Sequence, residues 1–484
     1  MRDVRTLRRL LSGGIASLAL IGAGANAASL RDALVSAYTS NPQLTGARSG
    51  QKALDADVAI AKSAARPNVG ATADYTENLH RSGIDLGSSP ARQLTAGINA
   101  SIPIYQGGAV AYGIKAAKSR NTAGLASLRS TEADVFTQAV AAYMDVIRDT
   151  AIVELNQKNV SVLDTNLRAT NDRFEVGDVT KTDVAQSEAR LAGARSQLDS
   201  AQAALTGSRE NFLRVIGIAS DTLDPPPPLP GLPQDPQGAV EVAIANNPDL
   251  LAARKNAEAE GYDIRVAKAA RLPRLSAVGG DNYLNYFNSF AADSSLGAGS
   301  AGAFAQRGNA ASAGLSLTVP LYQGGLPAAQ VRRAQAEASQ ALEQVIATER
   351  SVIAQARSTY ANYQAALAVI KSSETAVSAN ELALEGTRAE QTVGTRNVLD
   401  VLNAEQELLN SNVQLVSARR DAYVAGFALL AAMGKAEASD LGLDGGPLYD
   451  PAVHYKAVAN DWSDWGGDGT PKAVATTTYG PPVQ

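Results

Sequence analysis

The sequence predicts an α+β membrane protein built mostly from long coiled-coil hairpins of α-helices, because two kinds of pattern each occur twice along the chain. Apolar residues recur at seven-residue intervals over long stretches, which is typical of helices packed along a narrow seam. Shorter segments alternate apolar with small or polar residues, which is typical of strands. Both patterns appear in the same order in each half of the 484-residue chain, and this repetition indicates an internal duplication.

The clearest helical signal lies in the second half, around the segment Val393–Ala404. Gly394 interrupts two apolar heptad runs, and glycine adopts the left-handed conformation that ends many helices. Asn397 then suits the N-cap of a second helix, and Asp400 favours its positively polarised first turn. The chain therefore turns back here as the tip of an antiparallel helical hairpin. The flanking seams are Ala356, Tyr363, Ile370, Val377 and Leu384, then Val401, Leu408, Leu415, Ala422 and Leu429.

An equivalent hairpin occurs in the first half, around the segment Val176–Val184. Gly177 corresponds to Gly394 in the later turn. Asp183 corresponds to Asp400 at the same displacement along the chain. A displacement shared by a turn and its flanking seams is typical of a duplication. The earlier seams are Ala139, Val146, Val153, Val160, Leu167 and Phe174, then Val184, Leu191, Leu198, Leu205 and Phe212.

Residues 1–27 have the three parts of a secretory signal peptide. Four arginines lie in its first nine residues, an apolar stretch follows over Leu10–Gly24, and Ala25-Asn26-Ala27 provides a small-residue cleavage site. No later stretch reaches the ~18 uninterrupted apolar residues of a membrane-spanning helix. We therefore expect export, with no transmembrane helix in the mature chain.

The amino-acid composition argues against several classes of function and partner. The chain has no cysteine, so disulfides and a cysteine-linked lipid anchor are excluded. Its formal net charge of −5 at pH 7 disfavours nucleic acid as a main partner. His80 and His454 are the only histidines, and no acid–base pair of carboxylates is recognisable, so we expect no enzyme, metal or other cofactor. Gly297–Gly302 matches a dinucleotide fingerprint, but it lies in a loop between strands rather than before a helix.

Two segments alternate with the period of a β-strand, Leu94–Ile104 and Ala313–Leu321. Each has one apolar face and one face of small or polar residues. A weaker strand pattern precedes each of them, at Val69–Glu77 and Leu275–Phe287, so each half carries one β-hairpin. Aromatic residues near the strand ends suit a girdle at a membrane interface better than ordinary strand packing. These aromatic residues are Tyr75, Tyr283, Tyr286 and Phe287.

Four strands in one chain pose a physical problem, because they cannot close into a barrel and their exposed edges tend to pair with other chains. A length of about ten residues with one apolar face suits the wall of a bilayer-spanning barrel. A barrel shared between subunits satisfies both conditions. Two copies would supply eight strands and three copies twelve.

Each repeat begins with a helical segment that an Asn-Pro pair interrupts, and each second strand ends in Tyr-Gln-Gly-Gly, at Tyr105–Gly108 and Tyr322–Gly325. A long helix is then expected over about residues 110–174 and 327–390, ~100 Å at 1.5 Å per residue. The expected organisation is a signal peptide (1–27), a first repeat (28–223), a proline-rich linker (224–236), a second repeat (237–445) and a disordered C-terminal tail (446–484).

The signal peptide, the duplicated strand-and-helix plan, both Tyr-Gln-Gly-Gly turns and the sequence Val-Gly-Thr-Arg-x-x-x-Asp-Val-Leu-x-Ala together resemble the TolC family of outer-membrane channels. The resemblance covers roughly Ser29 to Leu443. It implies a homotrimer in which twelve strands form one β-barrel in outer-membrane lipid and twelve helices form a periplasmic tunnel. It also implies docking, through a periplasmic membrane-fusion adaptor, to an inner-membrane transporter.

The function that this resemblance implies is a passive exit duct of a tripartite efflux pump, gated at the helical tip. The alternative is the exit duct of a type I protein secretion system, because cargo choice belongs largely to the inner-membrane partner. A soluble periplasmic coiled-coil scaffold is a third possibility, and the alternating strands argue against it.

The resemblance also assigns roles to residues of the two tips. Thr182 and Asp183 on the first hairpin would meet Arg396 on the second and hold the gate closed, and Gln391 stands where the family pattern has a tyrosine. Without the resemblance, Asp183 would be read as a carboxylate that complements a helix dipole.

Asp400 retains the first of the two aspartates that form rings at the pore constriction in the family. Asn403 replaces the second aspartate, so we expect fewer negative charges and weaker cation binding there. The tips would dock the adaptor, and their residues are Val176, Gly177, Asp178, Val393, Gly394 and Thr395.

Overall fold

A computed structural model describes residues 28–79, 90–220, 222–289, 305–442, 448–475 and 477. The expected signal peptide, His80 and the glycine-rich segment Gly297–Gly302 lie outside these residues. The helices and strands in chain order are α1 (Leu30–Ser40), α2 (Pro42–Ser63), β1 (Asn68–Glu77), β2 (Arg92–Gln106), α3 (Ala109–Glu175), α4 (Lys181–Ile216), α5 (Pro236–Asn246), α6 (Pro248–Ala269), β3 (Arg274–Asn285), β4 (Arg307–Thr318), α7 (Leu326–Thr392), α8 (Val398–Ala432) and α9 (Pro451–Val458).

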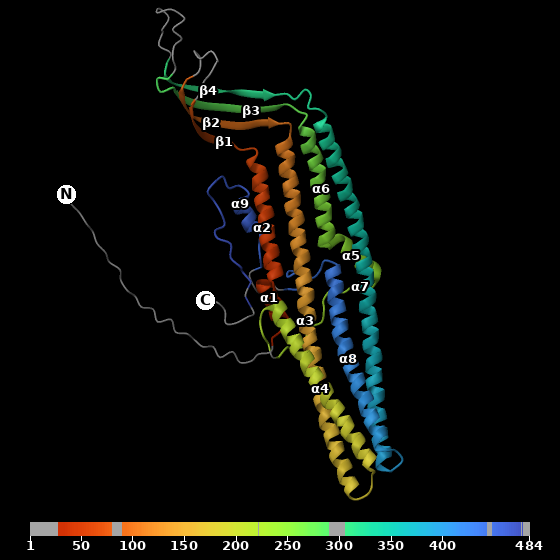
Figure 1. The fold of residues 1–484 in the computed structure, drawn as a ribbon. Helices are drawn as coiled ribbons and strands as arrows, with labels where there is room; N and C mark the ends of the chain where they lie inside the picture. The colour runs from red at the N-terminus through yellow and green to blue at the C-terminus, as the bar shows by residue number, and fades with distance from the viewer. Residues whose placement is uncertain are drawn as a thin grey trace, which may run out of the picture.

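The molecule is an elongated helical body with a sheet at one end and two helical hairpin turns at the other (Figure 1). Helices α3 and α7 have 67 residues each, so each is ~100 Å long at 1.5 Å per residue. Near the sheet they pack beside α2 and α6, and near the tips beside α4 and α8. Among the described residues, none of the helices combines the length and the apolar character that crossing a bilayer requires.

The two repeats begin alike, because an asparagine before a proline caps a helix in each. The Asn41 side chain accepts from the backbone N–H of Gln43 at 2.9 Å, and Pro42 starts α2. Its amide also donates to the carbonyl of Val215 near the end of α4, at 2.9 Å. Asn247 repeats this arrangement by capping α6 and donating to the carbonyl of Ala432 at 3.2 Å. The Asn-Pro pairs therefore interrupt the helices as the sequence predicts, and they also fasten the return helices.

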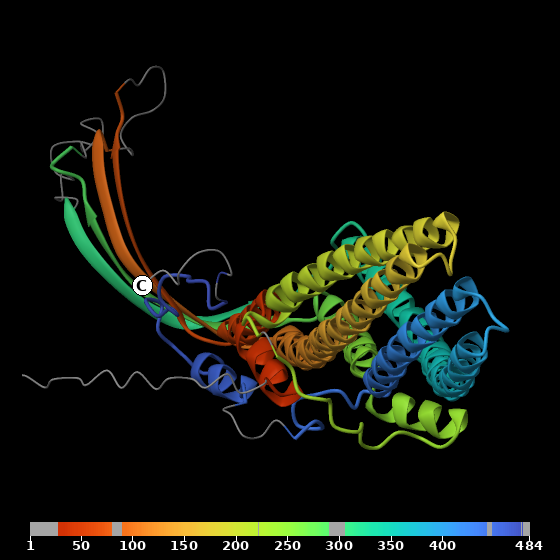
Figure 2. The ribbon, with the colours of Figure 1, turned by 90° about the horizontal axis from the view of Figure 1, so that it is seen from below.

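The four strands form one antiparallel sheet in the order β1-β2-β3-β4. Each repeat supplies one hairpin, and the pairing of β2 with β3 joins the repeats, with Ile98 opposite Asp281. The predicted strands are confirmed, with ends within a few residues of the expected ones except at the start of β4. Figure 2 shows that the strands are curved rather than flat. Every residue of β1 and of β4, the two edge strands, is exposed.

The two faces of the sheet differ, as the alternating pattern predicts. Directly opposed residues of antiparallel strands share a face, and on one face Ile98 and Leu315 expose 58% and 70% of their surface. On the other face the Asn282 side chain covers Gly97, where a Cβ would collide with it. Tyr75 and Phe287 meet edge to face, with ring centroids 6.0 Å apart. Large apolar side chains thus lie exposed on one face, an arrangement that water disfavours and lipid favours.

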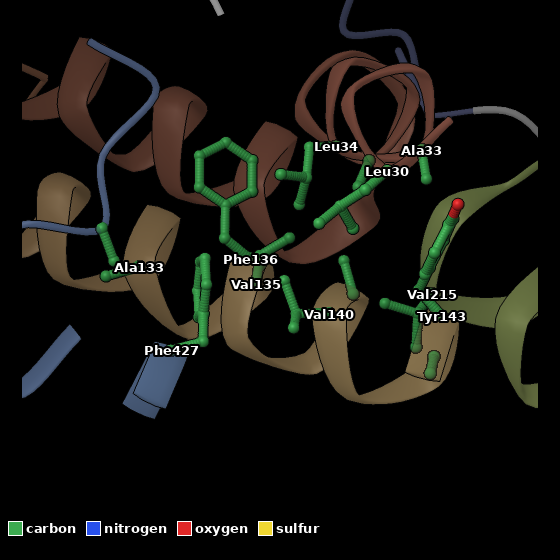
Figure 3. Packing of buried hydrophobic residues seen from close by; sticks show 14 of the residues in the cluster. Leu30, Ala33, Leu34, Ala133, Val135, Phe136, Val140, Tyr143, Val215 and Phe427 are labelled. Atoms are coloured by element: carbon green, nitrogen blue, oxygen red, sulfur yellow. The ribbon is translucent and has the colours of Figure 1, made fainter. Parts of the chain in front are cut away.

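The largest core lies midway along the body, where α1, α3, α4 and the end of α8 meet (Figure 3). Phe136 of α3 and Phe427 of α8 are almost fully buried there. The Tyr143 hydroxyl lies 2.9 Å from the carbonyl oxygen of Ala28 and 2.7 Å from that of Asp224. Burial raises the pKa of Tyr143, so this phenol stays protonated as a donor.

The proline-rich linker lies against the second hairpin. The Tyr360 hydroxyl donates to the carbonyl of Gln234 at 2.7 Å, and the Tyr423 hydroxyl to that of Pro227 at 2.9 Å. Burial raises the pKa of Tyr423 to about 12. Gly426 allows this close approach, because a Cβ there would lie 2.7 Å from the side chain of Leu229.

The C-terminal segment differs from the expectation of a disordered tail. Residues 448–475 are described, and they include helix α9, which packs against α2. The ring of His454 lies 2.8 Å from the Asp55 carboxylate, and the Lys62 amine donates to the carbonyl of Ala459 at 2.9 Å. These contacts are polar. Helix α9 therefore lacks the apolar pattern by which the other helices can be predicted.

Candidate gate at the helical tips

The first tip forms at the end of α3, where Gly177 has a φ of +80° and lets the chain reverse. The backbone N–H of Asp178 donates to the carbonyl of Arg173 at 2.8 Å. The Arg173 guanidinium also lies 2.6 Å from the Asp178 carboxylate. Both side chains are about half exposed, so this ion pair adds at most ~1 kcal/mol to the turn.

Asp183 closes the start of α4 in a capping box with Thr180. Its carboxylate accepts from both the backbone N–H and the hydroxyl of Thr180, each at 2.8 Å. These hydrogen bonds, first from the backbone and then from the hydroxyl, lower the pKa of Asp183 below its usual range. The carboxylate is therefore charged at neutral pH, and within one chain its role is to cap the helix.

The second tip repeats this geometry. Gly394 has a φ of +83°, and the backbone N–H of Thr395 donates to the carbonyl of Glu390 at 3.0 Å. The Arg396 guanidinium lies 2.8 Å from the Glu390 carboxylate, with both side chains 52% exposed. The hydrogen bond to Glu390, followed by its charge, raises the pKa of Arg396. Arg396 therefore stays charged, and in this structure its side chain pairs with Glu390 of the same hairpin.

Asp400 starts α8 in a second capping box. Its backbone N–H donates to the Asn397 side chain at 2.8 Å, and its carboxylate accepts from the Asn397 backbone N–H at 3.4 Å. Asn397 is thus the N-cap, as the sequence predicts. Asp400 and Asp183 occupy equivalent positions in the two repeats, which the sequence also predicts.

The structure does not pair the predicted gate residues with one another inside one chain. Arg396 contacts Glu390, and the Asp183 carboxylate contacts Thr180. Thr182 is exposed, and Gln391 contributes its backbone carbonyl, which accepts from Gly394 at 3.0 Å. A contact between Arg396 and Asp183 would have to form between subunits or in another state of the tips, so it stays a prediction.

Three polar contacts near the tips do join the hairpins to one another or the helices within them, and the sequence reasoning missed them. The Arg190 guanidinium on α4 donates to the Asn403 side chain on α8 at 2.6 Å. The Asn166 amide on α3 donates to the Glu405 carboxylate on α8, at 3.2 Å to the nearer oxygen. The Arg388 guanidinium on α7 lies 2.9 Å from the same carboxylate. Asn403, expected at the pore constriction, is therefore tied to the first hairpin.

Glu405 is a buried charged residue of this region, with 7% of its surface exposed. It joins α3, α7 and α8, so it couples both hairpins. Leu402 packs beside it in an apolar cluster with Leu163 and Leu191 of the first hairpin. A signal for Glu405 does exist in the sequence, because it lies four residues after the seam residue Val401 and therefore on the seam face of α8. A charged residue on an apolar seam indicates a paired, buried charge.

Among the predicted docking residues, one exposed valine lies at each tip. Val176 exposes 80% of its surface at the first tip, and Val393 exposes 74% at the second. Asp178 and Thr395 contribute to the turns through the contacts described above. The structure thus places the six tip residues at the end of the body farthest from the sheet (Figure 1).

No metal-binding cluster of three or more His, Cys, Asp or Glu residues occurs in the part of the chain that the structure describes. His454 contacts two carboxylates, those of Asp55 and Asp468, at 2.8 and 2.9 Å. This trio lies on α2 and the C-terminal segment, far along the body from the tips.

The strands are curved and have an exposed apolar face, and they are attached to two ~100 Å helices that each form a hairpin with a shorter helix. This architecture is typical of channels of the bacterial outer membrane whose helices reach into the periplasm. The chain belongs to the outer membrane efflux protein family, whose model matches residues 33–217 and 239–435. It is accordingly an outer-membrane exit duct that extends into the periplasm, in a family of channels rather than enzymes.

Individual relatives agree with this assignment. The chain is 34% identical over 457 residues to outer membrane efflux protein BepC of Brucella suis, covering 94% of each chain. It is 28% identical over 440 residues to outer membrane protein TolC of Vibrio cholerae, covering 88% of this chain and 95% of that one. Among solved structures, the outer membrane protein VceC of Vibrio cholerae superimposes with a TM-score of 0.70 at 23% identity, over 84% of this chain and 96% of that chain.

Proposed function

We propose that three copies of this chain close one twelve-stranded barrel, so that the duct is a homotrimer. The observation that carries this proposal is the sheet itself, in which β1 and β4 form edges with every residue exposed. Such edges are stable only when another strand or a cover pairs with them. Pairing β1 of one copy with β4 of the next satisfies both edges at once, and closure around an axis leaves no free edge.

The duct is the outer-membrane component of a tripartite efflux pump. The exposed valines Val176 and Val393 at the two tips dock a periplasmic membrane-fusion adaptor, because apolar side chains on a rigid turn are suited to bury against a partner. The adaptor connects the duct to an inner-membrane transporter. The duct supplies no energy of its own, and transport through it is passive.

The gate lies at the tips and consists of two layers. In the inner layer, Arg190 with Asn403 and Asn166 with Glu405 hold the second hairpin against the first. In the outer layer, Thr182, Asp183, Gln391 and Arg396 come together between neighbouring subunits. Asp400 and Asn403 face the constriction, where the Asp400 carboxylates favour cations.

The test of this function is whether the processed chain is found in outer-membrane fractions as heat-sensitive trimers that conduct ions in a planar bilayer. The proposal predicts conductance that favours cations over anions. A soluble monomer that never fractionates with membrane would contradict it, and would favour a periplasmic scaffold instead.

Cargo is decided by a separate experiment, because the transporter rather than the duct selects it. Deleting the gene should increase drug susceptibility and leave the secreted proteome unchanged. A deletion strain that loses a secreted protein and keeps its drug resistance would instead identify the duct of a type I secretion system.

A further inference from the structure

The C-terminal segment contains both tryptophans of the chain and holds them at the foot of the sheet. Trp462 and Trp465 are the only two tryptophans in the sequence. They expose 68% and 98% of their surface. Both follow α9, which lies beside α2 below β1 (Figure 1). Large aromatic side chains with this much exposure on a folded segment point to a surface that something else covers.

Two basic residues fix the position of this segment, Lys62 in the last turn of α2 and Arg66 just beyond that helix. The Lys62 amine donates to the carbonyl of Ala459 at 2.9 Å and to the side chain of Asn460 at 2.8 Å. The Arg66 guanidinium donates to the carbonyl of Asp461 and lies 4.7 Å from the centre of the Trp462 ring. Since β1 begins only two residues after Arg66, Trp462 lies at the junction between helix and sheet.

The turn that carries the tryptophans has internal hydrogen bonds. The backbone N–H of Ser463 donates to the Asp461 carboxylate at 2.9 Å, and that of Trp465 donates to the Ser463 hydroxyl at 3.3 Å. We call residues 461–466 the tryptophan turn. Beyond the turn, Asp468 lies 2.9 Å from the His454 ring. The tryptophan turn is therefore held at both ends, by Arg66 and by His454, and its exposure follows from the fold.

Other exposed aromatic side chains occur where strands give way to helices at the same end of the body. Tyr105, at the end of β2, exposes 49% of its surface, and Tyr322, just before α7, exposes 89%. Tryptophan and tyrosine concentrate at the headgroup level of membranes, because their rings are amphipathic. The tryptophan turn thus lies with Tyr105 and Tyr322 at the foot of the strands.

We propose that Trp462 and Trp465 insert into the phospholipid headgroup region of the periplasmic leaflet and anchor the C-terminal segment to the membrane. The inference rests on the proposed function, because it takes the sheet to be the wall of a membrane-spanning barrel. The turn itself carries Asp461 and Asp464, and Asp468 follows it. Attraction to anionic lipid therefore contributes little, and burial of the indole rings among zwitterionic lipids drives the contact.

The chain offers a direct test, because its intrinsic tryptophan fluorescence comes from this turn alone. The full-length protein is reconstituted into vesicles of phosphatidylcholine, with or without bromine atoms near the headgroup end of the acyl chains. We expect brominated lipid to remove more than half of the emission, and aqueous acrylamide to quench it less than it quenches free tryptophan. The variants W462F and W465F assign the signal to each ring, and lipid should quench Trp465 at least as strongly as Trp462.

Ion conductance of the same vesicles separates failure of this inference from failure of the proposed function. If the vesicles conduct but acrylamide alone quenches the emission, the rings lie in water and the anchor is refuted. If they conduct and neither quencher acts, a neighbouring subunit covers the rings and the anchor is again refuted. A chain that does not insert and conduct would overturn the proposed function together with the anchor.

Discussion

The Arg190 guanidinium on α4 and the Asn403 side chain on α8 lie 2.6 Å apart, and this hydrogen bond links the two hairpins of one chain close to their tips. We propose that Asn403 lies at the pore constriction. Its bond to Arg190 holds it against the first hairpin, so a movement of the second hairpin away from the first must break this bond. The contact therefore provides a handle on opening that leaves the barrel untouched.

Replacing Arg190 with alanine should favour the open duct. A partly exposed hydrogen bond of this kind contributes about 0.5–1 kcal/mol, so its loss should raise the open-to-closed ratio roughly two- to fivefold. The open probability of single channels in planar bilayers measures this ratio. Arg195→Ala is the matched control, because Arg195 lies on the same helix and pairs with Asp164 inside its own hairpin at 3.5 Å. An equal open probability in the two variants would show that Arg190 has no role in the gate.

Arg396 and Glu390 allow the outer layer of the gate to be tested. If Arg396 acts across subunits on Asp183, then Arg396→Ser and Asp183→Asn should each raise conductance, and Glu390→Gln should lower it or leave it unchanged. The reason is that Glu390 competes for the same guanidinium at 2.8 Å. If Glu390→Gln alone reproduced the effect of Arg396→Ser, Arg396 would act by stabilising its own hairpin and not by a contact with Asp183 of another subunit.

Glu405 should matter more for stability than any exposed carboxylate of the second hairpin. Glu405→Ala leaves the Arg388 guanidinium and the Asn166 amide without their shared acceptor, at a cost of about 1–3 kcal/mol for the lost buried partner. Thermal unfolding of the purified protein, followed by circular dichroism, reports this loss. Glu374→Ala is the control, since Glu374 pairs with Arg419 at 3.2 Å while 52% of its side chain is exposed, and its loss should cost below ~1 kcal/mol.

The His454 clasp predicts a dependence of the C-terminal segment on pH. Burial alone lowers the pKa of His454, but hydrogen bonds to Asp55 and Asp468 outweigh it and leave the pKa above its ordinary value. Both ring nitrogens face carboxylates, from α2 and from the C-terminal segment, so the folded state favours the doubly protonated ring. A raised pKa stabilises the fold fully below the unfolded value of about 6.5, and this stabilisation is lost as pH rises through the folded value.

Amide hydrogen exchange of α9, corrected for the intrinsic effect of pH, measures this dependence. Protection should fall as pH rises from about 6.5 upward, and His454→Gln should remove the dependence while lowering protection at acidic pH. Asp468→Asn keeps the contact with Asp55 and should move the transition to lower pH. Protection of α9 that does not change with pH in the wild-type protein would contradict the clasp.

The sequence predicted the helices and strands that have a clear local signal, such as a turn glycine or a regular alternation of apolar residues. The ends of α3 fall within a residue of the expected ones because Gly108 and Gly177 both have positive φ there. Strand β2 was recognisable because its alternation is regular. The C-terminal helix was not predicted, because its segment is held by Asp55 and Lys62 of α2 and by Arg66 just beyond α2, which lie far away in the sequence.

The gate shows the limit of local reasoning more sharply. Both capping boxes are local, so the positions of Asp183 and Asp400 in them could be inferred from spacing alone. The bond between Arg190 and Asn403 depends on how two hairpins approach each other in space. Nothing in either heptad specifies that approach, because it is set by packing of the seams along their whole length.

The central claim, closure of one barrel by three copies, can be tested directly because the chain has no cysteine of its own. Thr72→Cys on β1 is combined in turn with a cysteine at Ala310, Ser312 or Gly314 on β4, and the protein is oxidised in its native membranes. For the pair that matches the register between subunits, closure by three copies predicts a covalent trimer on a denaturing gel, which reducing agent returns to monomer. Absence of any cross-linked species for every pair, in membranes where the protein conducts, would contradict a barrel closed by β1 and β4.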